Sequence, residues 1–247
     1  LWLKRNPLGA EGVASLARML RSNRHLRVLD LVNTDLRSAG VHALVDALCT
    51  ENRSLQSLYL SGNGLGSSSV AALSRLLHEA PHIKALYLSV NRLGDQGAIA
   101  LAEALRANST LQTLELASND IGPEGAKALF SAVRRHPGMQ SLNLGYAPSS
   151  KVLGAQTNHI GDEGAGHAAE LLAALPVLRK LDLTRNGITA EGLAALTEAL
   201  CRNRQLGSLI VDGSLPEALV THLARNRADH GDLPVPIDQA LIKSVYR

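Results

Sequence analysis

The feature that most constrains this chain is a pattern of leucines that repeats along almost its whole length. Each copy reads L-x-x-L-x-L-x-x-N-x-L and is followed by a glycine and by leucines spaced four apart. The copies open at one shared apolar position, which is occupied in turn by Leu26, Leu55, Ile83, Leu111, Met139, Leu178 and Leu206. Their spacings are 29, 28, 28, 28, 39 and 28 residues. With a truncated copy at Leu1, the chain holds about eight units.

Each unit combines two different periodicities. The segment Leu55–Leu60 ends in alternating apolar residues, which predicts a short strand buried on one face. The segment Gly97–Leu105 has apolar residues four apart, which predicts a helix with one apolar stripe. The sequence therefore predicts an α/β protein in which one strand and one helix alternate.

Stacking of the units decides the predicted architecture. One strand and one helix cannot bury their own apolar faces, but neighbouring units can cover one another. Successive strands then pair in a parallel sheet with right-handed crossovers through the helices. Helix axes need about 8–10 Å and strands about 4.8 Å, so the stack must curve. We expect a right-handed horseshoe, with the parallel sheet on its concave face and the helices on its convex face.

Composition narrows the function classes. Hydrophobic residues make up 45% of the chain and aromatic residues only 2%, so leucine, alanine and valine must build the core. The net charge of +3 is too small to indicate nucleic-acid binding by itself. No apolar run approaches the roughly 18–20 residues that a membrane span needs. The two cysteines favour a reducing compartment, and we expect a cytoplasmic protein.

The segment LYLSVNRLGDQGAIALAEALRANSTLQTLELASNDIGPEGAKAL resembles the leucine-rich-repeat family of the ribonuclease-inhibitor type. Similar repeats occur in ribonuclease inhibitor, NOD-like receptors, Ran GTPase-activating protein and bacterial leucine-rich-repeat proteins. The resemblance covers residues 1–214, which we predict to form a leucine-rich-repeat solenoid. It is specific for the fold and much less so for function, because the motif residues are structural. It implies a protein that binds another macromolecule.

A column of asparagines follows the predicted strands. A buried asparagine there can satisfy backbone groups of the turning chain, so stacked copies predict a ladder. Thr34 and Ser214 occupy the same column and are expected to weaken the ladder locally. The column holds Asn6, Asn63, Asn91, Asn119, Asn158 and Asn186.

Candidate binding residues lie between the motif leucines, where side chains point into the concave face. The central column reads Trp2, Asp30, Tyr59, Tyr87, Glu115, Asn143, Asp182 and Ile210. Three of the six aromatic residues of the chain fall in it, and exposed Tyr and Trp are favoured interface anchors. Tyr59 and Tyr87 are expected to stack on neighbouring strands. The alternative is that these residues only stabilise the sheet by cross-strand pairing.

The flanking features add one candidate to this surface. The next column contains mostly small residues, from Ser61 and Ser89 to Ala117 and Gly145, which leave room for a ligand. Tyr146 follows the sixth strand and borders the insertion. The predicted partner-binding residues are therefore Trp2, Tyr59, Tyr87, Glu115, Asn143, Tyr146 and Asp182.

Two segments depart from the repeat. Residues 147–157 form an insertion of about 11 residues, which we expect to project from the rim as a loop that either grips a partner or is merely tolerated. Residues 215–247 are predicted to form a C-terminal helical cap, with one helix over Pro216–Arg227 and a stripe of Ile237, Leu241 and Val245. The alternative for this tail is an amphipathic docking helix.

Several short motifs are better explained by the repeat. His78 and His82 match the spacing of a zinc protease, but Pro81 interrupts the helix that this pattern needs. Asn52 and Asn108 match the glycosylation pattern at helix-to-strand connections, where we give glycosylation little weight. We expect no catalytic residue, no metal site and no cofactor.

The predicted function is a protein-binding scaffold that uses its concave face and rim loops, as part of a larger protein. The protein partner is unspecified, and no signal indicates an oligomeric state. A bacterial effector would instead act in a host cytosol. The alternative is a regulator of a small GTPase resembling Ran GTPase-activating protein; Arg92 lies on a rim loop, but one rim arginine is too common to carry that function over. Nucleic acid is disfavoured because Asp30, Glu115 and Asp182 are acidic.

Overall fold

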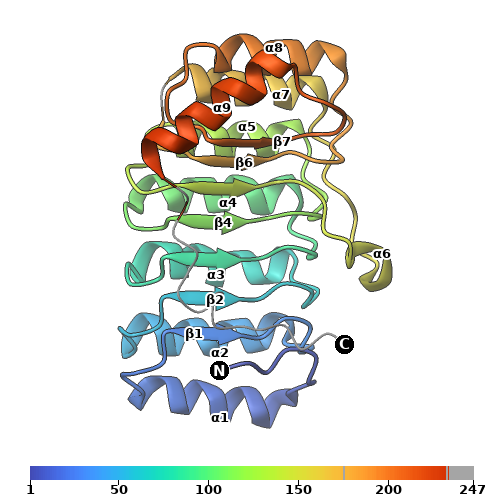
Figure 1. Cartoon of the computed structure of the whole chain (residues 1–247). Coiled ribbons are helices and arrows are strands. Elements are labelled where there is room, and N and C mark those ends of the chain that lie inside the picture. Colours follow the sequence, from blue (N-terminus) through green and yellow to red (C-terminus); the bar gives the residue numbers. More distant parts are fainter. Residues whose placement is uncertain (175, 232, 234–247) are drawn as a thin grey trace, which may run out of the picture.

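A computed structural model describes residues 1–174, 176–231 and 233 of the chain. Strands and helices alternate along it, as the repeat predicts (Figure 1). The helices are α1 (Gly9–Ser22), α2 (Arg37–Thr50), α3 (Ser67–Glu79), α4 (Gly94–Ala107), α5 (Pro123–Val133), α6 (Ser150–Leu153), α7 (Gly161–Ala173), α8 (Ala190–Leu200) and α9 (Glu217–His230). The strands are β1 (Val28–Asp30), β2 (Ser57–Tyr59), β3 (Ala85–Tyr87), β4 (Thr113–Glu115), β5 (Ser141–Asn143), β6 (Lys180–Asp182) and β7 (Ser208–Ile210).

The seven strands form one parallel sheet in the order of the sequence. Trp2 forms a parallel bridge with Asp30 and so occupies the position of an eighth strand in the truncated first copy. The predicted count of about eight units is thereby accounted for. The sheet lines the concave face and the long helices form the outer layer (Figure 1).

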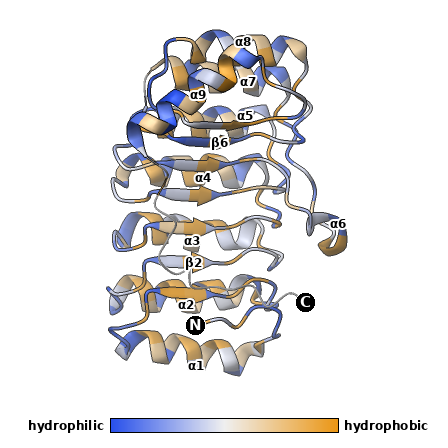
Figure 2. Ribbon diagram, in the orientation of Figure 1, coloured by the Kyte–Doolittle hydropathy of each residue, from blue (hydrophilic) through white to orange (hydrophobic). Residues whose placement is uncertain are grey.

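The core lies between these two layers and runs through the whole stack. The middle residue of each strand is a leucine, and those from Leu29 to Leu181 have no solvent exposure. Each outer helix packs on the next one along the stack, and α5 packs directly on α7 because α6 lies outside this layer. Hydrophobic residues are accordingly distributed along the full stack rather than gathered at one end (Figure 2).

The predicted asparagine ladder is present at the turns that follow the strands. Asn91 Nδ2 donates to the carbonyls of Leu88 in its own repeat, at 2.8 Å, and Leu60 in the preceding one, at 3.2 Å. Its Oδ1 accepts from the amides of Asn63 at 3.1 Å and Leu65 at 3.0 Å. Each such side chain joins two repeats and pairs backbone groups of turns that lie inside the core.

The ladder ends where the sequence departs from it. Thr34 is fully buried; its hydroxyl bonds to the Leu31 carbonyl at 3.0 Å and to Asn63 Oδ1 at 3.2 Å, and its backbone amide donates to Asn63 Oδ1 at 3.0 Å. Ser214 and Asn6 are exposed, and Asn6 donates only to carbonyls of its own turn. The expected local weakening of the ladder at Thr34 and Ser214 stays a prediction, and the exposed Asn6 is a further departure from the buried column.

A second asparagine column, which the sequence analysis missed, lies at the opposite edge where the helices end. Asn108 Nδ2 donates to the Leu77 carbonyl of the preceding repeat, and its Oδ1 accepts from the Thr110 and Leu111 amides at 2.8 Å. Asn52 and Asn203 make the same set of bonds. The two glycosylation-like motifs are thus explained, because Asn52 and Asn108 are buried and their amides are engaged.

The insertion projects at the rim, as the sequence predicts, but part of it is a helix instead of a loop (Figure 1). It forms a short helix, α6, which Gly154 ends in a left-handed conformation. The segment bends back along the rim: Ala147 N donates to Ser118 Oγ at 3.1 Å, and a Cβ on Gly62 would lie 2.9 Å from Leu153 Cδ1. A loop was expected from Pro148, Ser149, Ser150 and Gly154, but apolar contact of Leu153 with an earlier turn stabilises a helix.

Helix α9 covers the last strand, where a helix was predicted. Leu219 and Leu223 join the core. Asn226 Nδ2 donates to the Asn203 and Leu206 carbonyls, and Arg227 Nη2 donates to the Gly207 carbonyl at 3.0 Å. These side chains of α9 pair the carbonyls at the end of the stack, which a further repeat would otherwise pair. The stripe of Ile237, Leu241 and Val245 lies outside the described residues.

We predict that Asn91→Ala lowers the free energy of unfolding by about 3 kcal/mol, because it leaves buried carbonyls and amides of two repeats unpaired. Asn6→Ala is the matched control, since Asn6 occupies the same column but is exposed. It should change stability by less than about 0.5 kcal/mol. Urea unfolding followed by circular dichroism measures both values, and equal losses would contradict the role given to the ladder.

Candidate protein-interaction surface

The central column of the concave face is assembled in the predicted register. The strand pairings place Tyr59 beside Tyr87, Tyr87 beside Glu115, and Glu115 beside Asn143, each on the next strand. Trp2 and Asp182 continue the column toward the two ends of the sheet. Six of the seven predicted binding residues therefore lie in one row, and Tyr146 lies just beyond the end of β5.

The two tyrosines stack as expected, but one of them is not open to a partner. Their ring centroids lie 3.9 Å apart and their planes differ by 4°. Tyr87 is only 6% exposed, whereas Tyr59 is half-buried. Burial and a hydrogen bond with Tyr59 raise the pKa of Tyr87 far above its usual value. We had expected Tyr87 to be an exposed anchor, and its burial makes it a support for Tyr59 instead.

Trp2 is the most accessible aromatic residue of the column, with 47% of its surface exposed. Its neighbour Asp30 is buried, and its Oδ1 accepts from the Val32 amide at 3.0 Å. Asp30 thus stabilises the end of β1. Trp2 combines a large apolar ring with a backbone held in the sheet, which favours it as a contact for a partner.

The middle of the column is acidic. Burial raises the pKa of Glu115, and the charge of Asp182 raises it further. Lys180 and a hydrogen bond with Asn143 oppose this shift. Asp182 accepts from the amide of Thr184 at 3.0 Å and from its hydroxyl at 2.8 Å, so its carboxylate is held in one orientation. This acidic row suits a cationic side chain of a partner.

Tyr146 lies at the rim, next to the insertion. The Arg185 guanidinium carbon lies 4.3 Å from the centre of the Tyr146 ring, which is a cation–π contact. Gly145 precedes Tyr146, and a Cβ placed on Gly145 would overlap Asp182 Oδ1 and Thr184 Oγ1. The small residue in this column therefore makes room for Asp182 rather than for a ligand.

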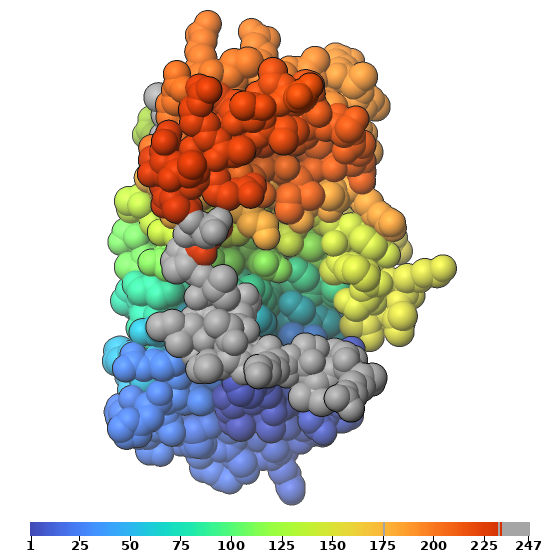
Figure 3. All heavy atoms as spheres, viewed as in Figure 1, coloured from blue at the N-terminus to red at the C-terminus, as the bar shows by residue number. Residues whose placement is uncertain are grey.

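Beyond the rim, α6 presents Val152, which is 86% exposed. The segment that carries it stands out from the molecular surface beside the concave face (Figure 3). Sequence reasoning identified the insertion but not this residue, because the exposure follows from the helix that the segment forms. Val152 and Tyr146 give the rim its own apolar contact points.

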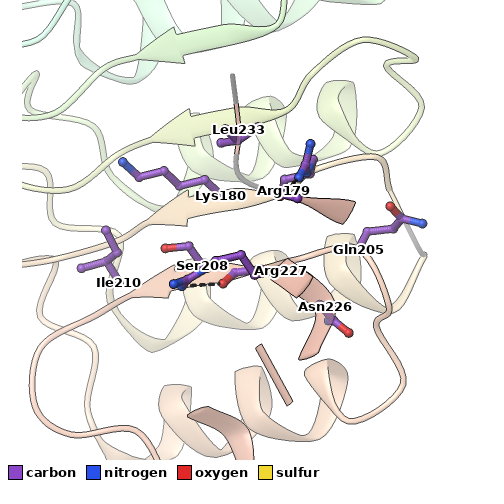
Figure 4. Close-up of a pocket in the computed structure, with 10 residues that line it drawn as sticks. Arg179, Lys180, Gln205, Ser208, Ile210, Asn226, Arg227 and Leu233 are labelled. Atoms are coloured by element: carbon purple, nitrogen blue, oxygen red, sulfur yellow. Dashed lines mark hydrogen bonds between the residues drawn. The ribbon is translucent and has the colours of Figure 1, made fainter. Parts of the chain in front are cut away.

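A basic pocket that sequence reasoning missed lies at the C-terminal end of the same face (Figure 4). It has a volume of about 460 Å³ and lies between β6, β7 and α9. Arg179, Lys180 and Arg227 line it. Arg227 comes from the helix after the last repeat, so only the folded chain places it beside Lys180.

The described residues show no group of three or more histidine, cysteine or acidic side chains arranged to hold a metal ion. Cys49 is buried and Cys201 exposed, and both are free thiols. Among the described helices, none has the length and apolar character required to cross a bilayer.

We predict that Glu115→Gln makes the protein more stable at neutral pH. A carboxyl whose pKa is raised by folding binds protons more tightly in the folded state, so its charge costs stability above the ordinary pKa of about 4.3. That cost disappears as the pH falls and both states become protonated. Urea unfolding should show the variant more stable at pH 7 and equal to wild type at pH 3.5. Lower stability of the variant at pH 7 would contradict this electrostatic description.

The comparisons with known proteins agree with this geometry. The model of the leucine-rich-repeat family matches residues 22–45, 51–74, 79–102, 107–130 and 174–196. A 73-residue stretch is 40% identical to the centrosomal protein of 78 kDa from Mus musculus. That stretch is 27% of this chain and 9% of the relative, so the chain spans only a small part of its length.

Two solved structures match this chain in part. A tropomodulin C-terminal domain from Caenorhabditis elegans matches with 14% identity and a TM-score of 0.49, over 57% of this chain and 87% of that one. Actin-binding site 2 of leiomodin-1 matches with 19% identity and a TM-score of 0.47, over 75% and 88%. Repeat spacing, parallel sheet, asparagine ladder and the matched repeats lead to one conclusion: the described part of this chain folds as a leucine-rich-repeat solenoid.

Proposed function

We propose that this chain is a protein-recognition module that binds a polypeptide partner through the concave face and the adjoining rim. The observation that carries the proposal is the central column, in which Trp2, Tyr59, Glu115 and Asp182 share one row of a continuous sheet. A rigid row of aromatic and charged side chains supplies both contact area and specificity.

The surface is divided into zones of different chemistry. Aromatic residues dominate its N-terminal half, and Glu115 and Asp182 make its middle acidic. This order of an aromatic zone and an acidic zone along the sheet favours a partner with apolar groups facing Trp2 and basic groups facing Glu115. The rim contributes Tyr146 and Val152, which extend the contact area beyond the sheet.

The proposed role is non-catalytic, with no cofactor and with its site of action in the cytoplasm. Binding modules of this kind serve as parts of larger proteins, and the local similarity to a centrosomal protein supports a role in an assembly rather than in chemistry. We do not carry the GTPase-regulator alternative further. Arg92 is an exposed rim residue, and its backbone N donates to Leu65 O at 2.7 Å. This is a bond of the repeat turn, and it gives Arg92 no special role.

We predict that the double variant Trp2→Ala/Tyr146→Ala loses at least about tenfold in affinity for a captured partner, because it removes two accessible aromatic contacts. Ile99→Ala/Val177→Ala is the matched control, since both residues are exposed and lie outside the sheet face. A pull-down from cell extract identifies the partner, and titration with the purified partner measures the affinity.

Circular dichroism must first show that both double variants are folded. Loss of affinity in the concave-face variant alone supports the proposal. Equal affinity of the two variants would place the binding site elsewhere on the molecule.

A further inference from the structure

The basic pocket at the end of the concave face contains donors from three different elements. Lys180 comes from β6, Ser208 from β7 and Arg227 from α9. Lys180 and Ser208 are direct neighbours across the two strands. Figure 4 shows the Lys180 amino group, the Ser208 hydroxyl and the Arg227 guanidinium on one side of the pocket, with Arg179 at its other end.

The cations differ in what they already bind. Arg179 donates to the carbonyls of His230 and Gly231 and so holds the end of α9. Arg227 uses one nitrogen on the Gly207 carbonyl. Within the described part of the chain, Lys180 Nζ and Ser208 Oγ make no hydrogen bond, and no carboxylate lines the pocket. Among the described residues, three positive charges therefore surround a space of about 460 Å³, and no carboxylate is part of its lining.

We propose that this pocket binds an acidic side chain of a polypeptide partner, with Lys180, Ser208 and Arg227 as the donors. The inference rests on the proposed function, whose concave face the pocket continues. An ammonium, a hydroxyl and a guanidinium offer charge-assisted hydrogen bonds to a carboxylate. Ile210, which also lines the pocket, supplies an apolar wall for the methylene groups of a glutamate.

Neighbouring charges favour a polypeptide over a nucleic acid. Asp182 lies two residues from Lys180 on the same strand face, and Glu115 is close enough for Lys180 to affect its pKa. A continuous polyanion that followed the sheet from the pocket would meet these carboxylates and be repelled. A peptide can place an acidic residue in the pocket and basic or apolar residues along the rest of the face.

The test is an NMR titration of the full chain with a blocked tetraglutamate peptide, and with tetraglutamine as the uncharged probe. We expect tetraglutamate to shift the backbone amides of residues 179–182, 207–210 and 226–231, and tetraglutamine to shift none of them. Lys180→Glu should weaken binding by about tenfold or more, because it removes a charged donor. Lys180→Gln is a milder second variant if Lys180→Glu does not fold.

The matched control is Lys127→Glu, which makes the same charge change on an exposed residue of α5. If Lys127→Glu weakens binding as much as Lys180→Glu, the attraction is non-specific and the proposal fails. It also fails if the shifts lie elsewhere, or if inorganic phosphate or a single-stranded oligonucleotide occupies the pocket more tightly than tetraglutamate. Because the probe is a defined peptide, failure here leaves the partner-capture experiment unaffected, and the reverse also holds.

Discussion

The hydrogen bonds of the buried asparagines are the interaction on which the rest of the structure depends. In every repeat the chain must turn from the sheet toward the helix while it is still inside the core, where water cannot satisfy its backbone groups. Asn63, Asn91 and Asn158 supply both a donor and an acceptor at this point, and each bonds to two repeats. The turns therefore take the same shape from one repeat to the next. Because the turns match, the strands stay in register, and the concave columns follow from that register.

Much of this structure could be predicted because the same spacing of apolar residues recurs in each repeat and specifies the same strand and helix. The central column from Trp2 to Ile210 and the tyrosine stack followed directly from the spacing of leucines. Features that depend on distant parts of the chain were not predictable in this way. The burial of Tyr87, the contact of Leu153 with Gly62 and the approach of Arg227 to β7 all require the folded molecule. The second column was missed because Ala80 and His136 interrupt its asparagines in the sequence.

The candidate surface gains its character from small departures within a regular frame. A uniform repeat would present the same side chain on every strand, whereas here aromatic, acidic and basic residues follow one another along the sheet. The insertion and α9 add groups at the rim and at the end of the stack, and both are held by contacts with earlier repeats. A partner that fits must match this order of chemistry as well as the shape. The proposed binding of a polypeptide rests on that order.

Native-state hydrogen exchange tests the central claim most directly, because it reports the stability of each backbone hydrogen bond. The amides of Leu36, Leu65 and Ile121 donate to ladder asparagines rather than to the sheet. The account predicts that they exchange as slowly as the amides of Leu60 and Leu88, which directly follow β2 and β3 and donate to the neighbouring strand, through the same cooperative opening. If they exchange as fast as the amides around the exposed Asn6, the asparagine bonds do not hold the repeats together, and the rigid concave surface loses its physical basis.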